Sequence, residues 1–244
     1  MILSRENIEE IAAAVTMDFN NFFFQDNDGE ERTKARCTPI DQFASQYLGL
    51  SVCFARLSPD GSLCGVTAYA DTEYQVVEMG ITRKLRLKRN EVVLDRSFVE
   101  PGNIRKLCGK RRFTLAHECA HQILFQMESN EKKCSCRKMY EEDRAYTVRE
   151  LKSREDWNEW QANVLGAAIL MPRNEIALAM RNLAKGRRLI RYGEWFAYPD
   201  RLIITTLCDL FGVSRTAITI RLSKLGYMEE RPYTEYVDPL EVMA

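Results

Sequence analysis

Histidine is scarce in this sequence, which holds only two histidines in 244 residues. Long apolar runs are also missing, and no stretch approaches the roughly 20 residues that a membrane-spanning helix needs. The first residues, Met1 to Asn7, lack the basic segment and apolar run that are typical of a secretory signal peptide. The eight cysteines are unevenly spaced, which disfavours a disulfide framework. We therefore expect a cytoplasmic protein with reduced thiols and no membrane association.

The sequence also has no excess of either charge, because 35 acidic residues balance 35 basic ones. A dedicated nucleic-acid or membrane-surface binder is normally lopsided in charge, so any contact with DNA is expected to be weak or indirect. A hydrophobic fraction of 45% is ordinary for a globular protein with a full core. The length suits one large domain or two small ones.

Both histidines lie in one motif, H-E-x-x-H, formed by His117, Glu118 and His121. Residues four apart on a helix share a face, so the two imidazoles would point at one place, with Glu118 available as a general base. Such a short match can arise by chance, and two hydrogen-bonded core histidines are the alternative. The flanking apolar residues recur at helical spacing, which favours an amphipathic helix. They are Phe113, Ala116, Ala120, Ile123 and Met127.

A catalytic zinc site of this kind needs a third protein ligand, usually from a second helix. The sequence predicts such a helix from an N-cap at Ser153 to Met171, where Pro172 ends it. Within that helix Glu159 is the best-placed carboxylate, since Glu155 and Asp156 lie a turn earlier, near the cap. A solvated helix acid is the alternative interpretation of Glu159.

Several ordered segments carry a resemblance to a known family. They are Arg112–His121 (R-F-T-L-A-H-E-C-A-H), Glu159–Asn163 (E-W-Q-A-N), Ala168–Pro172 (A-I-L-M-P), Phe211–Ala217 and Arg221–Gly226. On these segments the chain resembles the ImmA/IrrE metallopeptidases, which belong with the gluzincins. The likeness covers most of the chain in order. The interval between the second histidine and the third ligand is long and polar, so we expect a loop near the site to differ from the usual family pattern.

The resemblance implies a zinc-dependent, site-specific endopeptidase whose substrate is a helix-turn-helix transcriptional repressor of the Xre type. Cutting that repressor would release genes for stress response or for excision of a mobile element. One alternative is a DNA-binding regulator that reads DNA through residues 202–228, with the metal as structural support. Another is a metal-loaded partner that sequesters a repressor without cutting it. Glu118 argues against the second alternative, because a pure binder needs no general base.

The expected chemistry follows from these residues. Zinc held by His117, His121 and Glu159 would lower the pKa of its water from about 15.7 towards 7. Glu118 would take the proton from that water and pass it to the leaving amine. Asn163, four residues after Glu159, is expected to orient a histidine through its amide. Manganese is the alternative metal, although two histidines, a glutamate and an open position favour zinc.

The expected fold class is α+β, with a small antiparallel sheet packed on the metal helix and the third-ligand helix. The hydrophobic period changes from about 3.6 to about 2 near residue 51, and the first two strands face each other across a turn at Pro59–Gly61. In gluzincins the edge strand of such a sheet can bind an extended substrate. Val92, Val93 and Leu94 are the candidate edge strand here, and an ordinary half-buried strand is the alternative. The strands are expected over residues 51–57, 63–70, 74–79 and 91–95.

The chain divides by pattern into an N-terminal helix and loop, a metallopeptidase domain, a helix-turn-helix-like region and an acidic tail. These parts span residues 1–36, 37–190, 200–228 and 229–244. Segment 186–200 is expected to be irregular, and the tail after Met228 disordered.

Three other features have alternative explanations. Two basic runs, at residues 83–89 and 105–112, are either solvated faces or contacts to a partner's acidic surface or its DNA. Cys134 and Cys136 could bind a metal or sense oxidants, but a chance pair is the simpler interpretation. Cys119 points away from the ligand face and should be a small core residue.

Overall fold

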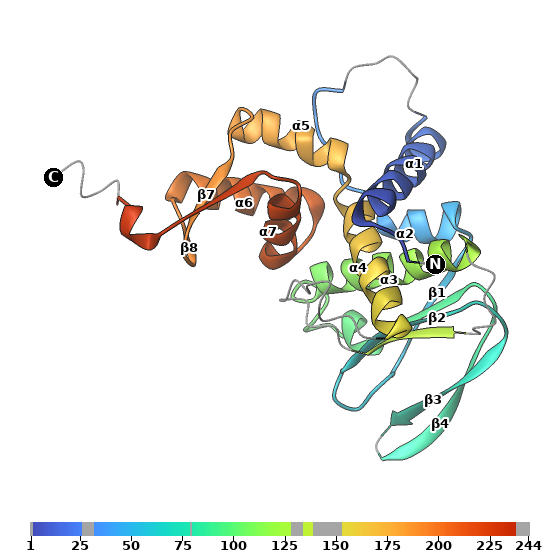
Figure 1. The fold of residues 1–244 in the computed structure, drawn as a ribbon. Helices are drawn as coiled ribbons and strands as arrows, with labels where there is room; N and C mark the ends of the chain where they lie inside the picture. The colour runs from blue at the N-terminus through green and yellow to red at the C-terminus, as the bar shows by residue number, and fades with distance from the viewer. Residues whose placement is uncertain (1, 26–31, 79, 128–133, 139–152, 238–244) are drawn as a thin grey trace.

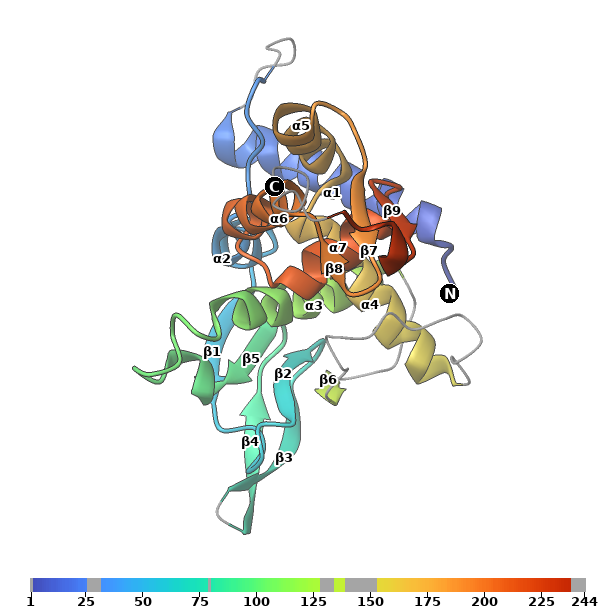
Figure 2. The same ribbon diagram turned by 90° about the vertical axis from the view of Figure 1, so that its left-hand side faces the viewer.

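The computed structural model describes residues 2–25, 32–78, 80–127, 134–138 and 153–237, and its fold is α+β. The long helix α3 (Cys108–Met127) runs between a small sheet on one side and a helical layer on the other (Figure 2). In that helical layer α4 (Arg154–Leu170) packs directly on α3, and α1 (Arg5–Phe24) packs on α4. The predicted metal helix and third-ligand helix are therefore confirmed, and they are in contact.

Local sequence signals explain where these helices begin. The Ser4 hydroxyl accepts a hydrogen bond from the Asn7 amide, and the Asn7 side chain reaches back to Ser4, which forms a capping box before α1. Ser153 and Asp156 form the same arrangement before α4. The predicted N-caps at Ser4 and Ser153 are both confirmed. The short helix after Pro39 is split into α2 (Ile40–Gln42) and a π-helical turn, η1 (Phe43–Tyr47).

The main sheet contains β1 (Ser51–Ala55), β2 (Leu63–Ala68), β5 (Glu91–Asp95) and β6 (Cys134–Lys138), in the order β1-β5-β2-β6. The predicted hairpin between the first two strands is wrong, because β5 lies between them. The sheet is also mixed, since β1 and β5 run parallel while β2 pairs antiparallel with both β5 and β6. A turn at Pro59–Gly61 reverses the chain, but it does not decide which strand becomes the neighbour.

The candidate edge strand, Val92, Val93 and Leu94, is wrong for the same reason. These residues lie in β5, which has partners on both sides, and they are 0%, 1% and 0% exposed. A continuous apolar run is typical of a strand that is covered on both faces, and such a strand belongs inside the sheet. The outer strands are β1 and β6. The side chains of Cys134 and Cys136, on β6, lie outside the described residues.

A second, two-stranded sheet is formed by β3 (Thr72–Glu78) and β4 (Ile81–Leu87). The strand β4 was not predicted, because its charged residues look like a solvated run. Leu85 and Leu87 alternate with them, and Leu87 is only 2% exposed. These leucines join β3 residues on a small second core beneath the main sheet, which explains why the basic run becomes a strand.

The C-terminal part contains α5 (Arg173–Ala184), α6 (Tyr198–Phe211) and α7 (Arg215–Lys224). A three-stranded sheet lies beside them, with β7 (Leu189–Tyr192) between β8 (Trp195–Phe196) and β9 (Met228–Arg231), followed by the 3₁₀ turn η4 (Tyr233–Glu235). The predicted irregular segment is wrong, because β7 and β9 pair in parallel across 35 intervening residues, 193–227. The prediction of a disordered tail is wrong for β9 and η4, and residues 238–244 lie outside the described residues. Such a long-range pairing has no local signal. In the part of the chain that the structure describes, no single helix is long and apolar enough to cross a membrane, although α6 and α7, bent by 104° between them, meet the length and composition requirement together.

A buried contact links the C-terminal helix α7 to the N-terminal helix α1. Arg221 of α7 forms a two-pronged ion pair with Glu9 of α1, and its Nε donates to the Met171 carbonyl at 3.0 Å. Both charged residues are buried, at 4% and 9% exposure. This contact joins the first helix, the last helix and the end of α4.

We expect Arg221→Ala to lower the free energy of unfolding by about 3–5 kcal/mol, because it leaves the buried Glu9 carboxylate without its partner. Urea denaturation of the purified chain measures this loss. The matched control is the double variant Glu9→Leu/Arg221→Met, which removes both charges and should be clearly more stable than Arg221→Ala. Equal stability of the single and double variants would contradict a stranded carboxylate.

Candidate metal centre

The two histidines lie on the buried face of α3. His117 is 0% and His121 is 4% exposed, and Glu118 between them is also fully buried. The two Nε2 atoms are 3.0 Å apart, and the rings meet edge to face with centroids 4.5 Å apart. The helical spacing therefore does what the motif predicts, since it brings two imidazole nitrogens to one point.

Glu159 comes to the same point from α4. Its Oε2 lies 3.1 Å from His117 Nε2, and its Oε1 lies 3.2 Å from His121 Nε2. Burial by itself raises the pKa of Glu159, but hydrogen bonds and charge from both histidines outweigh that effect and hold the pKa well below its usual range. The carboxylate is therefore the ionised form that a cation needs. Its side chain is 19% exposed, so solvent reaches the cluster from this side.

The three side chains fit a metal ion. One ligand atom from each of His117, His121 and Glu159 lies within 4.8 Å of the others. Ligands about 2.0–2.1 Å from a tetrahedral zinc would be roughly 3.3–3.4 Å apart, which is close to the separations seen here. Two histidines and one glutamate also form the donor set of catalytic zinc sites that keep one position open for water or substrate. Both the spacing and the chemistry of the donors suit a divalent cation such as zinc.

Asn163 fixes the orientation of the first histidine. Its Oδ1 lies 3.1 Å from His117 Nδ1, on the opposite side of the ring from Glu159. Because an amide oxygen is an acceptor, this contact holds a proton on Nδ1 and directs Nε2 at the cluster, where Nε2 would bind a metal through its lone pair in place of a proton. Glu159 and Asn163 are four residues apart, so one face of α4 supplies both contacts.

We expect Asn163→Ala to weaken metal binding about 10–100-fold, because the His117 ring would lose the acceptor that holds its tautomer. Competition with a chromophoric chelator measures the affinity. The variant Asn163→Asp keeps an acceptor for His117 Nδ1, so it should bind the metal more tightly than Asn163→Ala. Unchanged affinity in Asn163→Ala would show that the contact has no role in metal binding.

Two glycines that sequence reasoning missed allow these elements to approach one another. A Cβ on Gly166 of α4 would lie 3.0 Å from the backbone nitrogen of His117, so α4 packs against α3 at the first ligand. A Cβ on Gly65 of β2 would lie only 2.6 Å from Glu118 Oε1 and 2.8 Å from Thr114 Cγ2. An isolated glycine inside a helix or strand is the signal that could have identified both positions.

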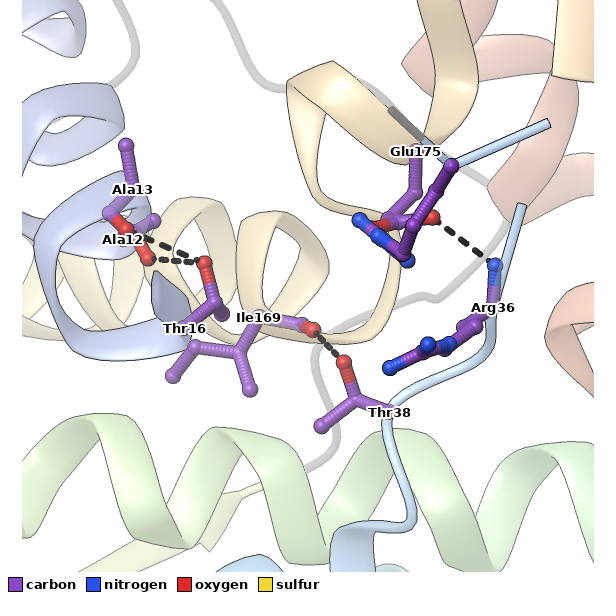
Figure 3. Close-up of polar contacts among 8 residues, drawn as sticks. Ala12, Ala13, Thr16, Arg36, Thr38, Ile169 and Glu175 are labelled. Carbon is purple, nitrogen blue, oxygen red and sulfur yellow. Dashed lines mark hydrogen bonds and ion pairs between the residues drawn. The ribbon is translucent and has the colours of Figure 1, made fainter. Parts of the chain in front are cut away.

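The end of α4 is held in place by contacts from distant segments (Figure 3). The buried Thr38 hydroxyl donates to the Ile169 carbonyl at 2.6 Å. Beyond Pro172, the buried Glu175 carboxylate accepts from the Arg36 backbone at 2.8 Å and pairs with Arg32. The segment before α2 therefore contacts both the end of α4 and the start of α5. These contacts fix the position of α4, the helix that carries Glu159.

Other residues singled out in the sequence lie away from the cluster. Cys119 is fully buried, and burial together with the nearby Glu118 carboxylate raises the pKa of its thiol, so it is the inert core residue that was predicted. Val92 to Leu94 contribute to the cores on either face of the sheet. Of the three basic residues on α7, Arg221 is buried, which leaves Arg215 and Lys224 at the surface.

Comparison with known proteins agrees with this geometry. Residues 108–223, from the start of α3 into the last turn of α7, match the family model described as Peptidase_M78, IrrE N-terminal-like domain. No curated protein matches the chain. The family resemblance predicted from the motifs is thus confirmed. Residues 108–223 form an IrrE N-terminal-like domain of the Peptidase_M78 family, with His117, His121 and Glu159 arranged as in an HExxH-type metal site.

Proposed function

We propose that this chain is a zinc-dependent endopeptidase that cuts a helix-turn-helix repressor of the Xre type at one site. The observation that supports it most is the convergence of His117, His121 and Glu159 next to a buried Glu118. A peptidase M78 domain makes a metallopeptidase the expected activity class. The substrate rests on the resemblance to the ImmA/IrrE family.

Each residue has a defined task in this proposal. His117, His121 and Glu159 would hold the metal, which when bound activates water and polarises the scissile carbonyl. Asn163 keeps His117 Nε2 directed at the cluster, because its Oδ1 accepts a hydrogen bond from the Nδ1–H group of that ring. The Glu118 carboxylate would take a proton from the attacking water and deliver it to the leaving amine. Burial of Glu118 excludes bulk water, so the proton stays with the reacting groups.

The experiment that tests the proposal is incubation of the chain with a purified repressor of the Xre type, followed by intact mass spectrometry. Zinc-loaded protein should give two fragments whose masses add to the repressor plus one water. The matched control is the same preparation after its metal has been removed with a chelator. The metal-free protein should leave the repressor intact, and addition of zinc should restore cleavage. Cleavage that persists after chelation would contradict a metallopeptidase.

Two other functions remain as outcomes of that experiment. A stable complex with an uncut repressor would support a metal-loaded binding partner. A DNA-binding regulator using residues 202–228 is supported by the 104° bend between α6 and α7 and by the Ser214 cap on α7. Against it, Arg221 is buried in its pair with Glu9, so α7, the second helix of that region, keeps few basic groups for DNA.

A further inference from the structure

The β3–β4 hairpin, residues Thr72–Leu87, projects from the body of the molecule, away from α3 and the helical layer (Figures 1 and 2). We call it the β3–β4 arm. One face is anchored, because Val76 and Leu87 are 7% and 2% exposed and pack on the second core. The other face is turned to solvent. The arm is therefore a fixed ribbon of two strands with a free face.

The second strand of the arm concentrates positive charge. Residues 81–90 contain no acidic residue, and their basic side chains are all exposed. These basic residues are Arg83, Lys84, Arg86, Lys88 and Arg89. Although the net charge of the whole chain is zero, these residues form a local basic stripe. An anionic partner is attracted by the local electrostatic potential of the surface that it approaches.

The first strand carries two acidic residues, Glu73 and Glu78, and Glu73 offsets part of this charge. Glu73 Oε2 lies 2.7 Å from Lys84 Nζ, and Glu73 Oε1 lies 3.7 Å from Arg86 Nε. The exposed fractions of the three side chains are 45%, 65% and 89%. Exposed ion pairs stabilise little, so a stronger anion such as a phosphate can replace the carboxylate. The shared carboxylate of Glu73 places Lys84 and Arg86 side by side on the free face. One negative charge does not neutralise both cations.

The tip of the arm carries two exposed apolar residues beside Glu78, the last residue of β3. Val77 and Ile81 are 40% and 60% exposed, and they flank the turn where the ribbon reverses. On the free face Gln75 and Thr82 add an amide and a hydroxyl that can donate and accept hydrogen bonds. The arm thus combines one basic strand, polar groups on its free face and two exposed apolar side chains near its end.

We propose that the β3–β4 arm binds duplex DNA by lying in a groove, with its basic strand on the phosphates and its tip against the base pairs. A groove about 12 Å wide admits a two-stranded ribbon. Basic residues that neutralise phosphates supply most sequence-independent affinity, and apolar side chains at the end of such elements contact or wedge base steps. An enzyme that acts on a DNA-bound repressor would be held near its substrate by this contact. DNA binding itself requires neither the metal nor proteolysis.

An anionic membrane fits the same charges less well. Attachment of a peripheral element to a bilayer grows with the apolar area that it inserts, and the arm exposes only two apolar residues, Val77 and Ile81, among the side chains described there. DNA needs no such area, because release of condensed counterions drives its association with cations. Vesicle binding is therefore included as a competing result.

The test is fluorescence anisotropy of a labelled, random-sequence DNA duplex titrated with the full chain at several salt concentrations. Lys84→Ala/Arg86→Ala should weaken binding about tenfold and lower the slope of log affinity against log salt by about two. Arg105→Ala/Lys106→Ala is the matched control, because it removes two exposed basic residues from another surface. That control should bind like wild type. Glu73→Gln, which frees both cations, should tighten binding several-fold.

The tip is tested separately. Ile81→Ser should weaken binding without changing the salt slope, since it removes no charge. Glu118→Gln should bind DNA like wild type, because Glu118 lies in the metal centre and not on the arm. The peptidase proposal and the DNA-binding proposal can therefore fail independently of each other.

Three results would overturn the proposal. The first is an absence of DNA binding by wild type at low salt. The second is equal weakening by Lys84→Ala/Arg86→Ala and by the control pair at residues 105 and 106. The third is arm-dependent binding to phosphatidylserine vesicles without arm-dependent binding to DNA.

Discussion

Glu118→Gln is expected to abolish cleavage of the repressor while the protein keeps its metal. Glutamine has almost the same shape as glutamate, so it can occupy the same fully buried position beside β2. The amide cannot accept the proton of the attacking water, and general acid–base catalysis typically contributes about 10²–10⁴ in rate. None of the three metal-binding side chains is changed. Single-turnover cleavage followed by intact mass gives the rate, and elemental analysis gives the zinc content.

The control for this prediction is His117→Ala. Losing one of three ligands should release the metal, so this variant should lack both zinc and activity, whereas Glu118→Gln should lack activity alone. The two phenotypes separate the base from the metal site. Proteolysis by metal-loaded Glu118→Gln would remove Glu118 from the mechanism, and a normal zinc content in His117→Ala would remove the proposed site.

The metal cluster was accessible from sequence because its parts depend on local geometry. His117 and His121 are one helical turn apart, and so are Glu159 and Asn163, so each pair shares a face once the helix forms. Strong caps and regular apolar spacing determine the two helices. The only long-range fact needed was that α3 and α4 meet, and the family resemblance supplied it.

The sheet could not be derived in the same way, because strand order depends on contacts between distant segments. The strand β5 enters between β1 and β2, although a turn at Pro59–Gly61 favours a hairpin. The signal that the hairpin reading overlooked was the fully apolar run Val92–Leu94, which indicates a central strand. The pairing of β7 with β9 was missed because it has no local pattern, and the strand β4 was missed because its charged residues outweighed the alternation of Leu85 and Leu87.

Gly65→Ala is expected to lower the turnover number about 100-fold and to leave metal affinity nearly unchanged. Gly65 lies in β2, where the strand passes directly over the Glu118 carboxylate. A methyl group built there would meet Glu118 Oε1 at 2.6 Å, so the carboxylate must move. Misplacing a catalytic group by about 1 Å can cost about 10²-fold in rate. The metal ligands are on other side chains, and none of them is among the three nearest atoms to this methyl group.

The same methyl group would also meet Thr114 Cγ2 at 2.8 Å, so a loss of activity could arise from a shift of the whole helix. Gly65→Ala/Thr114→Ser separates the two causes, because serine lacks the Cγ2 methyl group. If Gly65 positions Glu118, the double variant should regain stability to urea but not turnover. Gly102→Ala, in an exposed turn with open space around its Cβ, is the matched control and should behave like wild type. Recovery of turnover in the double variant, or metal loss in Gly65→Ala, would mean that Gly65 serves the packing of β2 on α3 and not the placement of the general base.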